Sequence, residues 1–157
     1  MVVELDQFDR VLASGSDEEK IAALKSMQGQ IADGEPVDFF DLARRQVADK
    51  NTDVRWQALI VIGSYIPFGR RNEEIWNLIV EFCGIDDDMQ DALATVLLEH
   101  LLEHDFDRTV ERIKTAIPVR SVPLLGLLER CWQFGQPEAK WRQLRQIIEG
   151  CTETESR

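Results

Sequence analysis

Residues 51–66, NTDVRWQALIVIGSYI, decide the fold class that the sequence predicts. Asn51 and Thr52 are residue types that cap helix N-termini, and Pro67 ends the helical pattern. Between them the chain is apolar on nearly every side and carries one arginine, Arg55, a turn from the start. Such a helix must be covered on most of its surface. The stretch therefore predicts a central helix of an all-α structure, with other helices packed on both flanks.

Helical signals continue along the rest of the chain. Apolar residues recur at i, i+3 and i+4 almost everywhere, and no alternating run typical of a strand is present. Cap and turn residues predict a short helix near 5–13 and further helices over 16–34, 36–49, 51–66, 72–84, 86–104, 105–117, 121–135 and 136–150. Within the first of these longer helices, Ser16 and Glu19 predict a capping box. Pro36 marks the expected start of the next.

The predicted helices form pairs that repeat with a period near 34 residues. DVRWQAL at 53–59 aligns with EEKIAAL at 18–24, with DDMQDAL at 87–93 and with SVPLLGL at 121–127. A second helix follows each of these stretches, and the apolar anchors of the second helices are Leu42, Leu78, Val110 and Leu144. A period of this size with two helices per unit is typical of a helical solenoid.

The stretch DVRWQALIVIG at 53–63 resembles the first half of a HEAT repeat, with its acid, arginine and small residue in order. The period extends the resemblance to HEAT-type and armadillo-like repeats over roughly residues 16–149. It implies a right-handed α-α superhelix of about four HEAT-like helix pairs. In this family such an arginine commonly pairs with an acid of a neighbouring repeat, which implies a structural role for Arg55. The aligned residues in the other units are Lys20, Met89 and Pro123.

The length of 157 residues favours one domain, and we expect it to span 1–150, followed by a flexible tail at 151–157. Three widely spaced cysteines, without a CxxC pair, provide neither a zinc ribbon nor a thioredoxin-type redox site. The first residues carry acids where a signal peptide would carry bases, and no apolar run reaches membrane-spanning length. These features predict a reduced, cytoplasmic protein.

The net charge of −11 is concentrated in one central stretch. Residues 72–107 contain eleven acids and no lysine or arginine, while the remaining 18 acids and 18 bases balance. Helical spacing predicts one polar strip and its extension by the acids that follow, a set made up of Glu73, Glu74, Asn77, Glu81, Asp86, Asp87, Asp88 and Asp91. Such a surface repels phosphate backbones and attracts basic proteins. We therefore expect a non-enzymatic protein–protein interaction module that binds a basic partner, for example a small inhibitor such as an immunity protein against a basic toxin.

One sequence motif suggests a metal site. HLLEH at 100–104 matches the H-x-x-E-H pattern of a zinc-peptidase group. On a helical wheel, however, His100 and His104 fall in line with Met89, Leu93 and Leu97, which predicts packing, and no third ligand has a motif. The consecutive aspartates 86–88 lack the alternation and the glycine of an EF-hand loop. We expect no metal and no cofactor.

The main alternative is a HEAT-like enzyme with a ligand- or nucleic-acid-binding groove, similar to DNA alkylation-repair glycosylases or phycobilin lyases. Its groove would use two arginine pairs and four tryptophans, namely Arg44, Arg45, Arg70, Arg71, Trp56, Trp76, Trp132 and Trp141. All four tryptophans stand at helical spacing among aliphatic residues, which predicts core packing. The pI near 4.6 also opposes binding to nucleic acid. A third interpretation, a subunit that docks through apolar surface, would require large exposed apolar patches.

Overall fold

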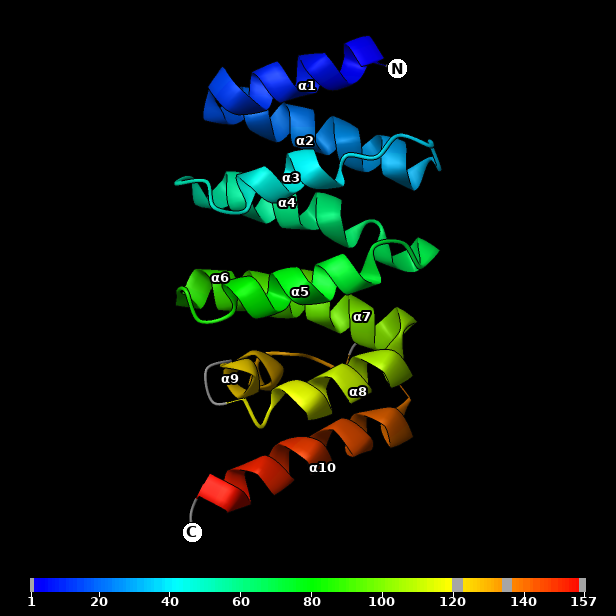
Figure 1. The fold of residues 1–157 in the computed structure, drawn as a ribbon, viewed down its shortest axis with the longest axis vertical. Coiled ribbons are helices and arrows are strands. Elements are labelled where there is room, and N and C mark those ends of the chain that lie inside the picture. The colour runs from blue at the N-terminus through cyan, green and yellow to red at the C-terminus, as the bar shows by residue number, and fades with distance from the viewer. Residues whose placement is uncertain (1, 120–122, 134–136, 156–157) are drawn as a thin grey trace. The chain divides into compact units, whose positions relative to one another are not determined.

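The structure is a computed structural model that describes residues 2–119, 123–133 and 137–155. Its regular elements are α1 (Val2–Ser14), α2 (Asp17–Ala32), α3 (Phe40–Gln46), α4 (Thr52–Gly63), the 3-10 turn η1 (Ile66–Phe68), α5 (Asn72–Phe82), α6 (Asp87–Ala92), the π-helical segment η2 (Leu93–Leu98), α7 (Glu99–His104), α8 (Phe106–Ala116), α9 (Leu124–Glu129) and α10 (Glu138–Glu155). Figure 1 shows their order along the chain. No strand occurs in the described residues, which confirms the all-α class.

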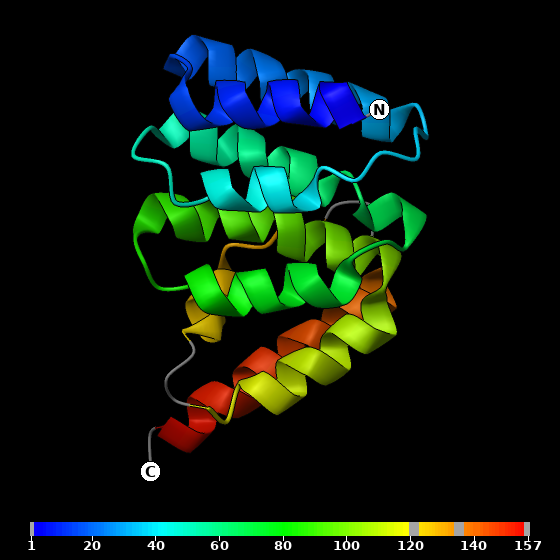
Figure 2. The ribbon, with the colours of Figure 1, turned by 45° about the horizontal axis from the view of Figure 1, so that its top comes forward.

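The chain divides into two compact units, Met1–Arg71 and Asn72–Arg157. In the first unit, α1 and α3 form one layer and α2 and α4 the other (Figure 2). The expected capping box at Ser16 is present, and the Asn51 side chain accepts from the N–H groups of Asp53 and Val54 at the start of α4. As predicted, α4 is covered on most sides, because seven of its twelve residues are buried.

The helix expected from Pro36 begins four residues later, at Phe40. Side chains satisfy the backbone N–H groups that precede it. Tyr65 accepts a hydrogen bond from the N–H of Phe39 at 2.7 Å, and an Asp38 carboxylate oxygen accepts one from the N–H of Phe40 at 3.1 Å. The Asp38 bond is local and competes with a helical one, and the segment before Phe40 is not helical.

In the second unit, α6, η2 and α7 follow one another without a break and form a single long helix that contacts α5, α8 and α9. The expected helix over 86–104 is therefore present, but with a π-helical segment in its middle. A π segment adds a residue to the turn and rotates everything beyond it by about 100° relative to an unbroken α-helix. Leu101 and Leu102 are buried in consequence.

The same rotation corrects the prediction that the two histidines pack with the apolar stripe. His100 and His104 are exposed, although Met89, Leu93 and Leu97 are buried as expected. The wheel assumed 3.6 residues per turn throughout, and the π segment lies between Leu93 and His100. The error therefore arises from one inserted residue that the apolar pattern does not mark.

The C-terminal part of the chain differs from the predicted boundaries. Helix α9 is short, Leu124–Glu129, and residues 121–122 and 134–135 of the helix predicted over 121–135 lie outside the described part. Helix α10 continues to Glu155, five residues into the segment 151–157 expected as a tail, because Gly150 weakens a helix without breaking it. Residues 156–157 are not among those described.

The single domain over 1–150 stays a prediction. No helix in the described ranges has the length and apolarity needed to cross a membrane.

Candidate interaction surface

Helix α5 displays the predicted polar strip. Its apolar side chains Ile75, Trp76, Leu78 and Ile79 are buried. The four strip residues Glu73, Glu74, Asn77 and Glu81 are exposed. The helix is thus amphipathic with a period of 3.6 residues, and burial of its apolar side leaves the carboxylates at the surface.

The second half of the predicted set lies at the start of α6. Asp86 is the N-cap of this helix and accepts a hydrogen bond from the N–H of Met89 at 2.7 Å. Asp87 and Asp91 are exposed, and Asp88 is half-buried. Carboxylates are favourable in this first turn because unpaired N–H groups give it partial positive charge. Part of the acidic cluster therefore stabilises the helix itself.

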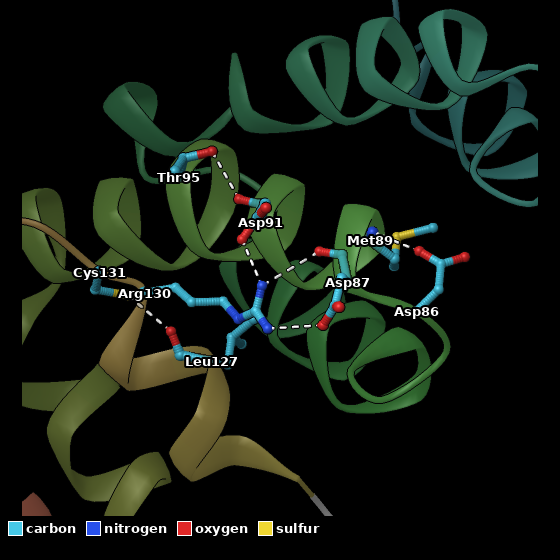
Figure 3. A network of polar contacts seen from close by, with 8 residues as sticks. All are labelled: Asp86, Asp87, Met89, Asp91, Thr95, Leu127, Arg130 and Cys131. Carbon is cyan, nitrogen blue, oxygen red and sulfur yellow. Dashed lines mark hydrogen bonds and ion pairs between the residues drawn. The ribbon is translucent and has the colours of Figure 1, made fainter.

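Arg130, at the end of α9, binds two of these carboxylates (Figure 3). One guanidinium nitrogen lies 2.6 Å from Asp91, and the other lies 2.8 Å from Asp87. The first nitrogen also donates to the carbonyl of Asp87 at 3.4 Å. The hydrogen bonds to Asp91 and then Asp87 raise the pKa of Arg130. A forked contact of this kind fixes orientation as well as position, so α9 is fastened to the first two turns of α6.

A second arginine neutralises the other end of the strip. Arg112 of α8 donates to Glu73 at 2.6 Å and lies 3.6 Å from Asp105, which in turn accepts from Asn72 at 3.2 Å. The predicted set is therefore exposed apart from the half-buried Asp88, but its two ends are ion-paired to bases. The acidic stretch does not reveal either partner, because both arginines lie beyond it, each 39 residues after its acid, Glu73 or Asp91.

Residues 130–132 each contact the long helix formed by α6, η2 and α7. Beyond Arg130, the Cys131 thiol is buried and lies 3.9 Å from the carbonyl of Ala94 in η2. The N–H of Trp132 donates to the Glu99 carboxylate of α7 at 2.7 Å. Glu99 is only 7% exposed, and this burial raises its pKa although the Trp132 hydrogen bond opposes the shift. The contacts of residues 130–132 with the long helix therefore extend from the start of α6 to the start of α7.

The tryptophans do not share one environment. Trp76 is buried, as core packing requires, but Trp132 is 67% exposed, which corrects the expectation that all four pack in the core. Its helical spacing was misleading because α9 ends at Glu129 and the next residues are not helical. Trp56 and Trp141 are half-buried.

The arginine pairs expected to line a groove make internal contacts. Arg45 pairs with Asp9 at 2.8 Å, and Arg71 pairs with Asp38. The Arg70 guanidinium lies over the Tyr65 ring, 5.0 Å from its centroid. These contacts use the guanidinium groups to brace the first unit.

Neither histidine is part of a metal-binding group. His104 lies 3.9 Å from Glu103, its neighbour in sequence. Partial desolvation lowers the pKa of His100 although the residue is exposed overall, and the charge of Glu103 opposes that shift. In the part of the chain that the structure describes, no three His, Cys, Asp or Glu side chains are grouped so that they could hold a metal ion. Burial also raises the pKa of the Cys83 and Cys131 thiols, which disfavours nucleophilic chemistry at either.

Arg55 is half-buried, and its guanidinium donates to Thr52 at 3.2 Å. Lys20, the residue aligned with Arg55, forms an ion pair of the kind that the resemblance implies for Arg55, at 2.7 Å from Asp49. Asn51 adds a hydrogen bond from its side chain to Asp17 at 2.8 Å. The structural role of Arg55 itself stays a prediction.

Comparison of the chain with protein-family models, with curated proteins and with solved structures found no match. The geometry of this surface therefore carries the functional argument alone.

Proposed function

We propose that the chain is a non-enzymatic interaction module built from HEAT-like helix pairs, which presents the acidic surface of its second unit to a basic protein partner. The observation that carries this proposal is the exposed strip Glu73, Glu74, Asn77 and Glu81 on α5, in a region of eleven acids without a lysine or arginine. A surface of one sign raises the association rate of an oppositely charged protein.

The repeat part of the proposal is supported by regular spacings. Consecutive N-caps are 35 residues apart, from Ser16 to Asn51 and from Asn51 to Asp86. Hydrogen bonds also join residues that are 33 or 34 apart in both units, as in Asp17–Asn51 and Asn72–Asp105. Contacts at one period are expected when each helix pair rests on the next.

The test compares affinity capture by the wild-type protein and by the double variant Glu74→Lys/Glu81→Lys. Asp87 and Asp91 stay unchanged because they hold Arg130. The matched control, Glu18→Lys/Glu35→Lys, reverses two exposed acids of the first unit. We expect a basic protein that wild type and control retain, that salt releases and that the α5 variant loses. Equal retention by all three proteins would show that the strip is not the binding surface.

The groove enzyme is the alternative with less support. It requires exposed aromatic residues beside available arginines, whereas Trp76 is buried and Arg45 and Arg71 are paired with Asp9 and Asp38. Trp132 is the exposed tryptophan, but its N–H contacts the carboxylate of Glu99, and the neighbouring Arg130 is paired with Asp87 and Asp91.

A further inference from the structure

We propose that Trp132 is the aromatic anchor of the acidic surface, where its indole stacks on a lysine or arginine side chain of the basic partner. This inference rests on the proposed function, because it names a residue and a contact within the same interaction. It differs from the electrostatic part of that proposal because the contact is made by a ring and not by a carboxylate.

The first argument is that the backbone of Trp132 is fixed by hydrogen bonding while the residue is largely exposed to solvent. Its N–H is bonded to the buried Glu99 carboxylate at 2.7 Å, and the preceding residue, Cys131, is buried against η2. Arg130 is fixed by Asp87 and Asp91. A position that is ordered before binding loses little conformational entropy on association.

The second argument is the exposure of this ring. Trp132 is 67% exposed as a residue, more than the other large hydrophobic residues that the structure describes as exposed, which are Phe68, Ile85 and Val119. Tryptophan is among the residue types most enriched at the centres of protein interfaces. A rigid backbone that presents such a ring to water matches the arrangement of a binding anchor.

The third argument is charge, which selects the occupant. The unit that carries Trp132 has 17 acids and 9 bases, a net charge of −8. Asp87 and Asp91 lie on the helix along which the segment 130–132 runs, and the Asp87 side chain is 93% exposed. Cations bind to the face of an indole more strongly than to other aromatic rings. A unit of net negative charge that exposes an indole therefore suits a cationic side chain and opposes a phosphate backbone.

The test uses the full chain labelled with 5-fluorotryptophan and a deca-arginine peptide as the probe. Fluorine NMR resolves the tryptophan signals, and Trp132→Phe assigns that of Trp132. We expect the Trp132 signal to shift on addition of the peptide, while an uncharged Gly/Ser peptide of the same length leaves it unchanged. Calorimetry on unlabelled variants supplies the affinities. Trp132→Ala should weaken binding roughly 2–30-fold, the range expected for a cation–π contact, and Trp132→Phe should weaken it less.

Trp132→Ala is expected to fold, because the contact with Glu99 is made by the backbone N–H and not by the ring. Ile85→Ala is the matched control: it truncates another exposed apolar side chain of the same unit and should bind the peptide as wild type does. An unmoved Trp132 signal, or equal affinity of Trp132→Ala and wild type, would overturn the inference.

Two further outcomes separate this inference from the proposed function. If Glu74→Lys/Glu81→Lys loses the peptide while Trp132→Ala keeps it, the acidic surface is supported and the anchor is rejected. If wild type does not bind the peptide at all, both are rejected. A Trp132 signal that responds to oligodeoxythymidine, or to protein concentration alone, and not to the peptide would replace the basic partner by a nucleic acid or by a second copy of the chain.

Discussion

Tyr65 shows how one side chain can join three segments of the first unit. It is fully buried, and its hydroxyl accepts from the N–H of Phe39 and donates to Asp38 at 3.2 Å. Asp38 also binds Arg71, whose φ of 62° is positive. Burial opposes ionisation of Asp38, but the hydrogen bond from Arg71 and then that from Phe40 lower its pKa. The strained backbone at Arg71 is thus held by a contact that stays ionic at neutral pH.

The phenol of Tyr65 should ionise at a higher pH than a free tyrosine does. Burial raises its pKa to about 12, with the Asp38 charge adding to the rise and the Phe39 hydrogen bond opposing it. Because Tyr65 is the only tyrosine in the chain, phenolate absorbance measured against pH reports it alone. We expect a midpoint of about 12 in the folded protein and about 10 in urea. The raised pKa adds stability that is lost as pH rises from about 10 toward 12. A folded-state midpoint near 10 would contradict the buried position.

Glu99→Gln should stabilise the protein at neutral pH. Burial raises the pKa of Glu99, so the folded state prefers the protonated carboxyl and stability falls as pH rises through that pKa. The amide oxygen can still accept from Trp132, and the charge is removed. We expect the free energy of unfolding at pH 7 to rise by about 1 kcal/mol, the usual size of a single-substitution effect, and the gain to disappear near pH 4.5. Urea unfolding measures it, with the exposed neighbour Glu103→Gln as a control expected to change little. If Glu99→Gln lowers stability at pH 7, the charged hydrogen bond dominates over the cost of burial.

At the scale of elements, the three helix starts that carry a side-chain cap are well encoded, whereas the start of α3 and the geometry inside the long helix are not. Three caps are residue types that favour helix N-termini and precede apolar runs, namely Ser16, Asn51 and Asp86. All three side chains accept hydrogen bonds in the structure. Aligned on these caps, the residue that corresponds to Arg55 is the buried Gln90, not Met89 as the apolar alignment gave. The cap fixes which residue starts the helix, whereas an apolar stripe tolerates a shift of one residue.

Deleting one residue from η2 tests the role assigned to the π segment. Without Val96, the buried residues before and after the deletion fall on one unbroken α-helical stripe, so Leu101 and Leu102 stay inward. We expect a folded protein that loses less than about 3 kcal/mol, the ordinary range for a tolerated change. Deletion of Asn77 from the regular helix α5 is the control, and it should unfold the protein because it turns the buried face outward. Urea unfolding followed by circular dichroism compares them. Equal damage from both deletions would show that the π segment is not an insertion.

For the whole molecule, the sequence was sufficient for the class of fold and for the exposed strip on α5, because both follow from the spacing of apolar residues. It was insufficient for contacts between distant residues. Arg112 and Arg130 bind Glu73, Asp87 and Asp91, but nothing local marks those partners. Trp132 illustrates the same limit: its exposure depends on where α9 ends and on the buried carboxylate of Glu99, neither of which is encoded by its neighbours.

The uneven charge predicts that salt acts differently on the two units. The second unit has a net charge of −8 and the first, with 12 acids and 9 bases, has −3. Like charges destabilise a compact state, and raising sodium chloride from about 10 to about 150 mM shortens the screening length from roughly 30 to 8 Å. Amide hydrogen exchange should therefore slow more in residues 72–157 than in 1–71 when salt is added. Screening also weakens the exposed Arg130 and Arg112 pairs, but surface pairs contribute only about 0–1 kcal/mol each. If exchange in 72–157 instead quickens with salt, these two arginine contacts outweigh the repulsion among the acids.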